Sequence, residues 1–173
     1  MDQFAREKNK STYAARVEAL LSQMTLEEKV GQTVLANAGA EDIKARVQSG
    51  QVGSVICTDV KWNNQLQRAA MEGSRLQIPL LIGADVIHGY RTTFPIPLAE
   101  SCSWNPELLE RASAAAAAEA ATTGANWIYA PMVDISRDPR WGRIAEGAGE
   151  DPFLGRAIAQ ARVRGFQSSP LPG

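Results

Sequence analysis

Four apolar runs of strand length recur along the chain, and each is followed by a segment with helical spacing. The runs are GQTVLANAG, VGSVICT, PLLIGAD and NWIYAPMV. Continuous apolar runs, rather than alternating ones, are typical of strands with both faces covered. Strands that alternate with helices are joined in parallel by right-handed crossovers, with the helices packed over the sheet. The sequence therefore predicts an α/β fold with a parallel sheet.

The helical segments carry their own start and stop signals. Apolar residues at helical spacing and the capping box of Thr25 and Glu28 predict two helical pieces within about residues 13–30. Asn105 and Pro106 predict the start of an alanine-rich helix, and Gly124 its end. The other expected helices are one marked by Ile43 and Val47 and closed by Gly50, one with its apolar face at Leu66, Ala69, Ala70, Gly73 and Leu76, and a last one from Asp151 and Pro152 to about Phe166.

Length and composition indicate one folded domain. The chain has 173 residues, of which 45% are apolar and 21% charged. Eighteen Lys and Arg against nineteen Asp and Glu leave a net charge of −1, which provides no field to attract nucleic acid or an anionic membrane. No apolar run approaches the length of a membrane span, and the N-terminus lacks the apolar core of a secretory signal. We expect a soluble protein, cytoplasmic as given, or periplasmic or secreted if a leader was removed.

Residues that bind metals or form disulfides are scarce. Cys57 and Cys102 lie outside any CxxC or Cys/His cluster, and His88 is the only histidine. This argues against a disulfide framework or a structural zinc site, and we expect both cysteines to be buried apolar residues. The sequence has no GxGxxG after its first strand and no GxxxxGK[ST], so we expect no metal and no cofactor.

Polar side chains begin where two of the apolar runs end, and parallel α/β folds bind ligands at that end of their strands. Asp85, His88 and Arg91 follow the third run within seven residues, and a loop from Asp134 through Arg143 follows the fourth. A carboxylate accepts two hydroxyl hydrogens, and a guanidinium presents a planar set of donors. Together these groups suit a polyhydroxylated ligand.

A structural interpretation of several of these residues stays open. The charges in SRDPRWGR could form a salt-bridge network that holds a long loop, and His88 could be a satisfied loop histidine. The tryptophans could form a wall against a sugar ring, although a buried core position is the commoner role. The residues concerned are Arg137, Asp138, Arg140, Trp104, Trp127 and Trp141.

Two long motifs resemble a known family. GADVIHGYRTTFPIPLAESCSWNPELL and APMVDISRDPRWGRIAEGAGEDPFLG, with the opening segment LLSQMTLEEKVGQ, resemble the N-terminal domain of the family 3 glycoside hydrolases, the periplasmic-type β-glucosidase and β-xylosidase group. The resemblance covers about residues 15–166. It implies a TIM-type (β/α)8 barrel, often followed by an α/β sandwich domain, that hydrolyses β-linked sugars with retention. Residues 1–173 would then be the N-terminal part of the barrel domain.

The same resemblance implies roles for four residues. Asp85 would accept hydrogen bonds from ring hydroxyls of the non-reducing sugar, and Arg143 would donate to hydroxyls of that sugar. His88 and Arg91 match positions that shape the pocket. The expected substrate-binding residues are therefore Asp85, Arg143, Arg91 and His88.

The catalytic carboxyl groups are expected outside this sequence. Retention needs two of them, about 5–5.5 Å apart. The family has a Lys-His pair and a nucleophilic Asp in a Ser-Asp motif beyond its last helix matched here, and this sequence has no Lys-His dipeptide. A full barrel takes about 250 residues, so four strands predict about the first half. An open half-barrel exposes strand edges and an apolar inner face, which predicts a missing C-terminal half or a homo-oligomer partner.

Three functions remain open on the sequence. The first is hydrolysis of terminal non-reducing β-D-glucosyl residues, with a β-glucoside or related oligosaccharide as partner, this segment supplying part of the sugar-binding subsite while being inactive alone. The second is a non-catalytic carbohydrate-binding or scaffold fragment. The third is an unrelated barrel enzyme, such as a metal-dependent hydrolase or a phosphate-binding lyase, which the single histidine and the lack of a late glycine-rich turn disfavour.

Overall fold

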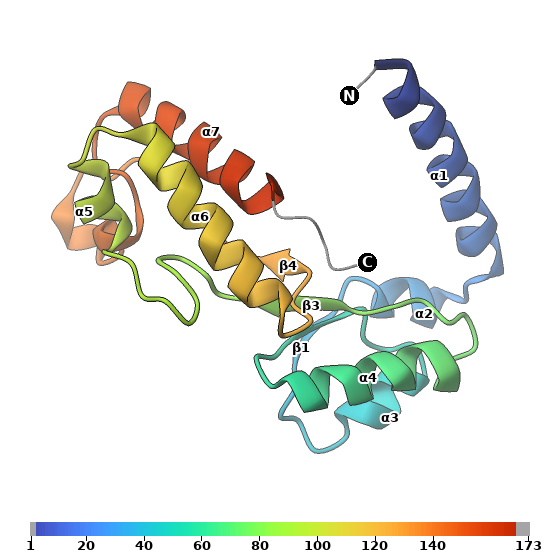
Figure 1. Cartoon of the computed structure of the whole chain (residues 1–173). Helices are drawn as coiled ribbons and strands as arrows, with labels where there is room; N and C mark the ends of the chain where they lie inside the picture. The colour runs from blue at the N-terminus through green and yellow to red at the C-terminus, as the bar shows by residue number, and fades with distance from the viewer. Residues whose placement is uncertain (1–2, 169–173) are drawn as a thin grey trace. The chain divides into compact units, whose positions relative to one another are not determined.

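The structure is a computed structural model that describes residues 3–168, with side chains from residue 13 onward. Figure 1 shows the elements in chain order. The strands are β1 (Leu35–Asn37), β2 (Ser54–Ile56), β3 (Leu81–Ala84) and β4 (Trp127–Ile128). The α-helices are α1 (Gln3–Gln23), α2 (Leu26–Gly31), α3 (Ile43–Gln48), α4 (Val60–Gly73), α5 (Pro97–Ser101), α6 (Pro106–Ala121) and α7 (Pro152–Ser168), and two 3-10 turns occupy Pro139–Trp141 and Ile144–Glu146.

The predicted α/β class is confirmed. Each strand lies inside one of the four apolar runs, although every strand is shorter than its run. β1 pairs in parallel with β2, and β3 pairs in parallel with β4. A helix follows each of these strands, as the alternating pattern of the sequence requires.

The chain forms two compact units, and the first consists of residues 3–56 and 64–81 of the described chain. In the β1–β2 pair, Ala36 lies opposite Val55 and both are buried. Leu35 and Ile56 occupy the other face and are 43% and 45% exposed. The expectation that both faces of the strands are covered is therefore wrong at these two positions, although Ser54, which lies opposite Leu35, is buried. Buried side chains of α3 and α4 complete that core: Ile43, Val47, Leu66, Ala69 and Ala70.

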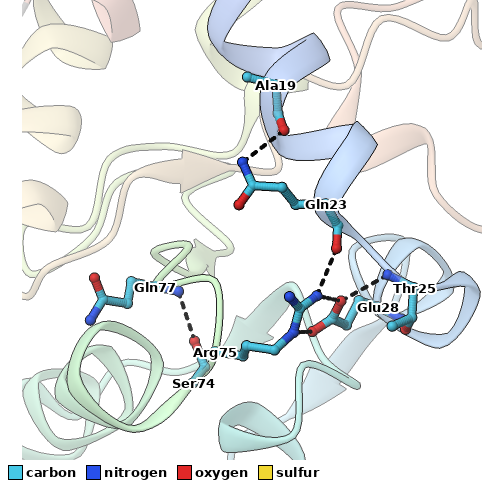
Figure 2. Close-up of polar contacts among 7 residues, drawn as sticks. All are labelled: Ala19, Gln23, Thr25, Glu28, Ser74, Arg75 and Gln77. Atoms are coloured by element: carbon cyan, nitrogen blue, oxygen red, sulfur yellow. Dashed lines mark hydrogen bonds and ion pairs between the residues drawn. The ribbon is translucent and has the colours of Figure 1, made fainter.

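A polar network ties three segments of the first unit together (Figure 2). Arg75, just after α4, donates from Nε and Nη2 to the two carboxylate oxygens of Glu28, at 3.0 and 2.5 Å. The same Nη2 donates to the backbone carbonyl of Gln23 at 2.8 Å. The predicted capping box is confirmed, since the Thr25 N–H donates to Glu28 and the Glu28 N–H donates to the Thr25 hydroxyl. The Arg75 guanidinium, followed by the Thr25 N–H, holds the pKa of Glu28 below its ordinary value.

The second unit consists of residues 57–63 and 82–168 and contains α5, α6 and α7 with the β3–β4 pair. α6 and α7 pack side by side (Figure 1). A Cβ on Gly165 of α7 would lie 2.2 Å from the backbone oxygen of Glu110 on α6, so only glycine permits this approach. The alanine-rich face of α6 is buried in a core cluster with the end of β3, as predicted for a packing helix. That cluster contains Ala84, Val86, Ala116, Ala120 and Ala125, with Tyr90, Phe94, Ile128 and Phe166 packed against it.

Two predictions of burial are wrong. Cys57 is only half-buried and Cys102 is exposed, and both thiols are free. The tryptophans expected in the core are exposed instead, by 71% at Trp104, 43% at Trp141 and 38% at Trp127. Each of these residues stands at the end of a strand, helix or 3-10 turn or in a loop, where an apolar side chain need not face the core. In residues 3–168 no helix is long and apolar enough to cross a membrane.

Candidate functional site

Asp85 directly follows β3, and its side chain is exposed between two residues whose side chains are buried. Its neighbours Ala84 and Val86 are buried to 0% and 1% exposure and anchor the backbone in the core of the second unit. Successive side chains of extended backbone point to opposite sides, so Asp85 is exposed between them. The apolar run therefore ends by placing a carboxylate on rigid backbone at the strand terminus.

His88 closes the loop that follows Asp85. Its backbone carbonyl accepts from the Phe94 N–H at 2.9 Å, and its ring Nδ1 lies 3.1 Å from the Phe94 carbonyl. The carbonyl can only accept, so this contact requires the proton on Nδ1. Gly89 makes the tight turn possible, with φ +107°, and a Cβ there would lie 2.0 Å from the Thr92 oxygen. The structural interpretation of His88 is therefore supported, with its ring holding the loop.

The next part of the loop, containing Arg91, is fastened to α6. The Glu119 carboxylate accepts from the backbone N–H groups of Arg91 and Thr92, both at 2.8 Å, and from the Thr92 hydroxyl at 2.6 Å. These bonds, led by that of the Thr92 hydroxyl, lower the pKa of Glu119, and the charge of Arg91 acts in the same direction. The exposed Arg91 side chain thus extends from a loop that α6 holds at two consecutive peptide groups.

The loop after β4 contains a salt bridge between Arg140 and Asp138, two of the residues whose structural interpretation stayed open. Arg140 donates from its backbone N–H and its Nε to the Asp138 carboxylate, each at 2.9 Å. The ion pair lowers the pKa of Asp138 and raises that of Arg140. Asp138 also caps the 3-10 turn Pro139–Trp141. These contacts favour the structural interpretation for Asp138 and Arg140.

Arg143 follows Gly142, which has φ +88°, and its guanidinium is hydrogen-bonded to the Glu146 carboxylate. Nε donates to Glu146 Oε1 at 2.9 Å and Nη2 to Oε2 at 2.5 Å. This bond is the main cause of a raised pKa for Arg143, and the charges of Asp134 and Asp85 add to it. Asp85, Asp134 and Arg143 therefore share one electrostatic neighbourhood. A guanidinium has five N–H donors, so Glu146 leaves others for a ligand.

Tyr129 lies over β3 beside this neighbourhood and was missed in the sequence. A Cβ on Gly83 would lie 1.8 Å from the Tyr129 hydroxyl, so the phenol rests on the bare backbone of the strand. Burial and then the charge of Asp85 raise the pKa of Tyr129. The ring packs edge-to-face on Trp127, with centroids 4.9 Å apart. A glycine inside a strand signals such a close approach, and Gly83 was the available clue.

A buried ion pair beneath the loop was also missed. Arg162 of α7 donates from Nη2 to Glu100 of α5 at 2.7 Å, and both side chains are less than a tenth exposed. Burial raises the pKa of Glu100, opposed by the charges of Arg162 and His88. The clue was a charged residue on the apolar face of the last helix, where Ile158 and Ala161 are also buried.

Taken together, the geometry defines an α/β domain with a carboxylate and a guanidinium gathered at the strand ends of its second unit. A carboxylate accepts from hydroxyl groups and a guanidinium donates to their oxygens, so the pair fits a polyhydroxylated ligand. In residues 3–168 no three His, Cys, Asp or Glu side chains come together in a way that could hold a metal ion.

Comparison with known proteins gives the family. The chain belongs to the family described as the Glycosyl hydrolase family 3 N terminal domain, which matches residues 25–171. A periplasmic β-glucosidase of Salmonella typhimurium is 42% identical over 158 residues, which are 88% of this chain and 21% of that protein. A β-xylosidase of Formosa agariphila is 28% identical over 89% of this chain and 18% of its own. The resemblance stated from the sequence is confirmed.

Solved structures agree on the fold. The β-glucosidase of Listeria innocua in complex with isofagomine matches with a TM-score of 0.80 and 37% identity, over 96% of this chain and 23% of that one. A β-glucosidase of intestinal bacteria involved in saponin metabolism matches with a TM-score of 0.76 and 41% identity. The match covers 89% of this chain and 21% of that protein. The TIM-barrel-type α/β fold is thereby confirmed. The chain spans about a quarter of the length of these relatives.

Proposed function

We propose that this segment supplies part of the sugar-binding subsite of a retaining β-glucosidase, which hydrolyses terminal non-reducing β-D-glucosyl residues. One observation carries the proposal: β3 and β4 are paired in parallel, Asp85 directly follows β3 and Arg143 stands in the loop after β4, so a carboxylate and a guanidinium follow the same ends of two neighbouring strands. The charge of Asp85 is also the last of the causes that raise the pKa of Arg143. In this proposal Asp85 accepts hydrogen bonds from ring hydroxyls, and Arg143 donates to hydroxyl oxygens of the same sugar. The β-glucosidase relatives support this choice of ligand.

His88 and Arg91 have a different part in the proposal. The His88 ring is engaged by the Phe94 carbonyl, and the backbone of Arg91 is engaged by Glu119. Both residues therefore shape the pocket by holding the loop between Asp85 and α5. The Arg91 side chain is exposed on that loop, and in this proposal it lies at the edge of the pocket.

The bond-breaking groups belong to another part of the enzyme in this proposal. A retaining glycosidase uses one carboxylate as nucleophile and one carboxylic acid to protonate the leaving oxygen, about 5–5.5 Å apart. Asp85 is assigned to the sugar hydroxyls, and the two reacting carboxyl groups are assigned to the part of the enzyme outside this segment. The match covers 21% and 23% of the length of two of the relatives, and more than three quarters of each lies outside it, which leaves room for these groups. The 173-residue chain alone then binds without turnover.

The central test is complementation. The chain is assayed on aryl β-glucoside and aryl β-xyloside, alone and mixed with the remaining portion of a family 3 β-glucosidase. We expect activity on the β-glucoside only in the mixture. Sugar binding that never leads to hydrolysis in any mixture would instead favour a non-catalytic carbohydrate-binding fragment.

The second test removes the acceptor. In the complemented enzyme, Asp85→Ala should weaken transition-state binding by about 2–4 kcal/mol, since hydroxyl groups of the sugar lose their charged partner. The measurement is kcat/KM on an aryl β-glucoside. Asp42→Ala is the matched control, because Asp42 is an exposed aspartate of the first unit. Equal kinetics for Asp85→Ala and the control would overturn the proposal.

A further inference from the structure

The buried pair of Arg162 and Glu100 contacts the loop that presents Asp85. The same Nη2 that binds Glu100 at 2.7 Å also donates to the backbone carbonyl of Ile87 at 3.0 Å. Ile87 is two residues beyond Asp85 in the sequence. A single guanidinium nitrogen therefore connects α7, α5 and the backbone next to the proposed sugar-binding carboxylate.

Arg162 also lies beside the segment after β4. A cavity of about 10 Å³ is lined by residues of that segment, of α5 and of α7. Asp134, Pro97 and Arg162 are among them. Arg162 thus lies next to the backbone that leaves β3 and next to the backbone that leaves β4, the two segments from which Asp85 and Arg143 extend.

Stability alone is a weak reason for this arrangement. Two charges are removed from water, and burial opposes the charged form of each: it raises the pKa of Glu100 and lowers that of Arg162. The Nε of Arg162 is buried and has no hydrogen-bond partner among the described residues. Replacing a buried ion pair by apolar residues is often neutral or stabilising, so the pair is poorly explained as a stabilising contact.

We propose that Arg162, held by Glu100, is a positioning residue that fixes the direction of the Asp85 carboxylate through the Ile87 carbonyl. This inference rests on the proposed function, since it assigns Arg162 to the same sugar-binding site. Arg162 does not touch the sugar. Its effect is geometric: a small displacement of a binding group is enough to reduce binding and rate by large factors.

The test uses a double variant designed to keep the fold. Arg162→Met with Glu100→Leu replaces the ion pair by apolar side chains and removes the donor to Ile87. In the complemented enzyme we expect a thermal midpoint close to that of the wild type, with kcat/KM on an aryl β-glucoside reduced at least about tenfold. The single variant Arg162→Lys keeps a charged donor and should recover part of the loss.

The matched control is a second ion pair that also involves α7 but is exposed. Arg164 of α7 donates to Glu110 of α6 at 2.9 Å, with side chains 58% and 36% exposed. Arg164→Met with Glu110→Leu should leave kcat/KM unchanged. Equal kinetics for the buried and the exposed double variants would overturn the positioning role.

The two proposals fail separately. If Asp85→Ala weakens isofagomine binding and the buried double variant does not, only the positioning role is lost. If Asp85→Ala itself has no effect on isofagomine binding, the proposed sugar site is lost and the role of Arg162 with it. Loss of folded structure in the double variant would move the test to Arg162→Met with Glu100→Gln, which removes the donor to Ile87 and keeps a polar group at position 100. Unchanged kinetics in that variant would again overturn the positioning role.

Discussion

Gly83 occupies a position of β3 where any side chain would collide with Tyr129. A Cβ there would lie 1.8 Å from the hydroxyl oxygen and 2.4 Å from the ring carbon that bears it. We predict that Gly83→Ala lowers the free energy of unfolding by about 1–3 kcal/mol, the usual effect of overpacking a well-packed site. Urea unfolding measures this change, and an unchanged midpoint would refute the close packing of Tyr129 on the strand.

Tyr129→Phe provides the companion experiment. The Tyr129 hydroxyl is buried and has no hydrogen-bond partner among the described residues. Removing an unpaired buried hydroxyl removes a desolvated group without breaking a bond, so the free energy of unfolding should stay equal or rise. In the Gly83→Ala background, Tyr129→Phe should recover part of the lost stability, because the nearest colliding atom is gone. A loss of stability in the single variant would indicate a bond to the hydroxyl.

Glu119 gives the loop of Arg91 a pH dependence with a defined sign. Its hydrogen bonds to Thr92 and Arg91 lower its pKa below the ordinary 4.5. A lowered folded pKa stabilises the fold above the unfolded value, and this contribution is lost as the pH falls through the folded value. We predict that Glu119→Gln is less stable than the wild type near neutral pH and that the gap closes below pH 4.5. Denaturant unfolding across this range measures it, and a constant gap would contradict the prediction.

Helices and strands were predictable where a local signal exists. The capping box at Thr25, the cap at Asn105 and the turn at Gly50 predicted their helices, and the four apolar runs contained the four strands. α5 was not predicted, because its five residues are too short for periodicity and its N-cap residue, Ile96, makes no side-chain capping bond. Local sequence signals predict that a helix or strand is present better than they predict its length.

Only part of the candidate site could be predicted from the sequence, because only some of its residues have a local signal. Asp85 and Arg143 stand out because each follows an apolar run, which is a local observation. The pair of Glu100 and Arg162 joins residues 62 positions apart, and no spacing rule connects them. The prediction that the tryptophans are buried was wrong, because the burial of a side chain depends on what packs against it from elsewhere in the chain. Residue roles at these positions remain predictions for the experiments above.

The cap of α6 is the element whose contribution can be measured most directly. The Asn105 side chain accepts from the Leu108 N–H at 3.0 Å, and Pro106 occupies the first helical position. We predict that Asn105→Ala lowers the free energy of unfolding by about 1 kcal/mol, the typical effect of losing a cap acceptor. Asn105→Asp keeps the acceptor and is the control. If both variants unfold at the same denaturant concentration, the cap contributes nothing to stability.

Considered as a whole, the described chain exposes apolar side chains on strands, where soluble proteins ordinarily cover them. In the first unit, Leu35 and Ile56 share one face of the β1–β2 pair and are 43% and 45% exposed. Leu81, whose N–H donates to the Gly53 carbonyl at 3.1 Å, is 50% exposed. Apolar strand surface that stays in water favours association with another chain. The complementing portion of the proposed enzyme is the partner that we expect to cover it.

This leads to a prediction about the chain in solution. Alone, the 173-residue chain should associate with itself in a concentration-dependent way, and sedimentation velocity measures the effect. Leu35→Thr with Ile56→Thr places β-branched residues, which suit strands, at both positions, removes apolar surface and should shift the population towards monomer. Leu26→Thr is the control, because Leu26 is 72% exposed but lies on α2. Addition of the complementing portion should suppress self-association, because both partners compete for the same apolar face. A monomer at all concentrations, with no binding to the complementing portion, would contradict the prediction.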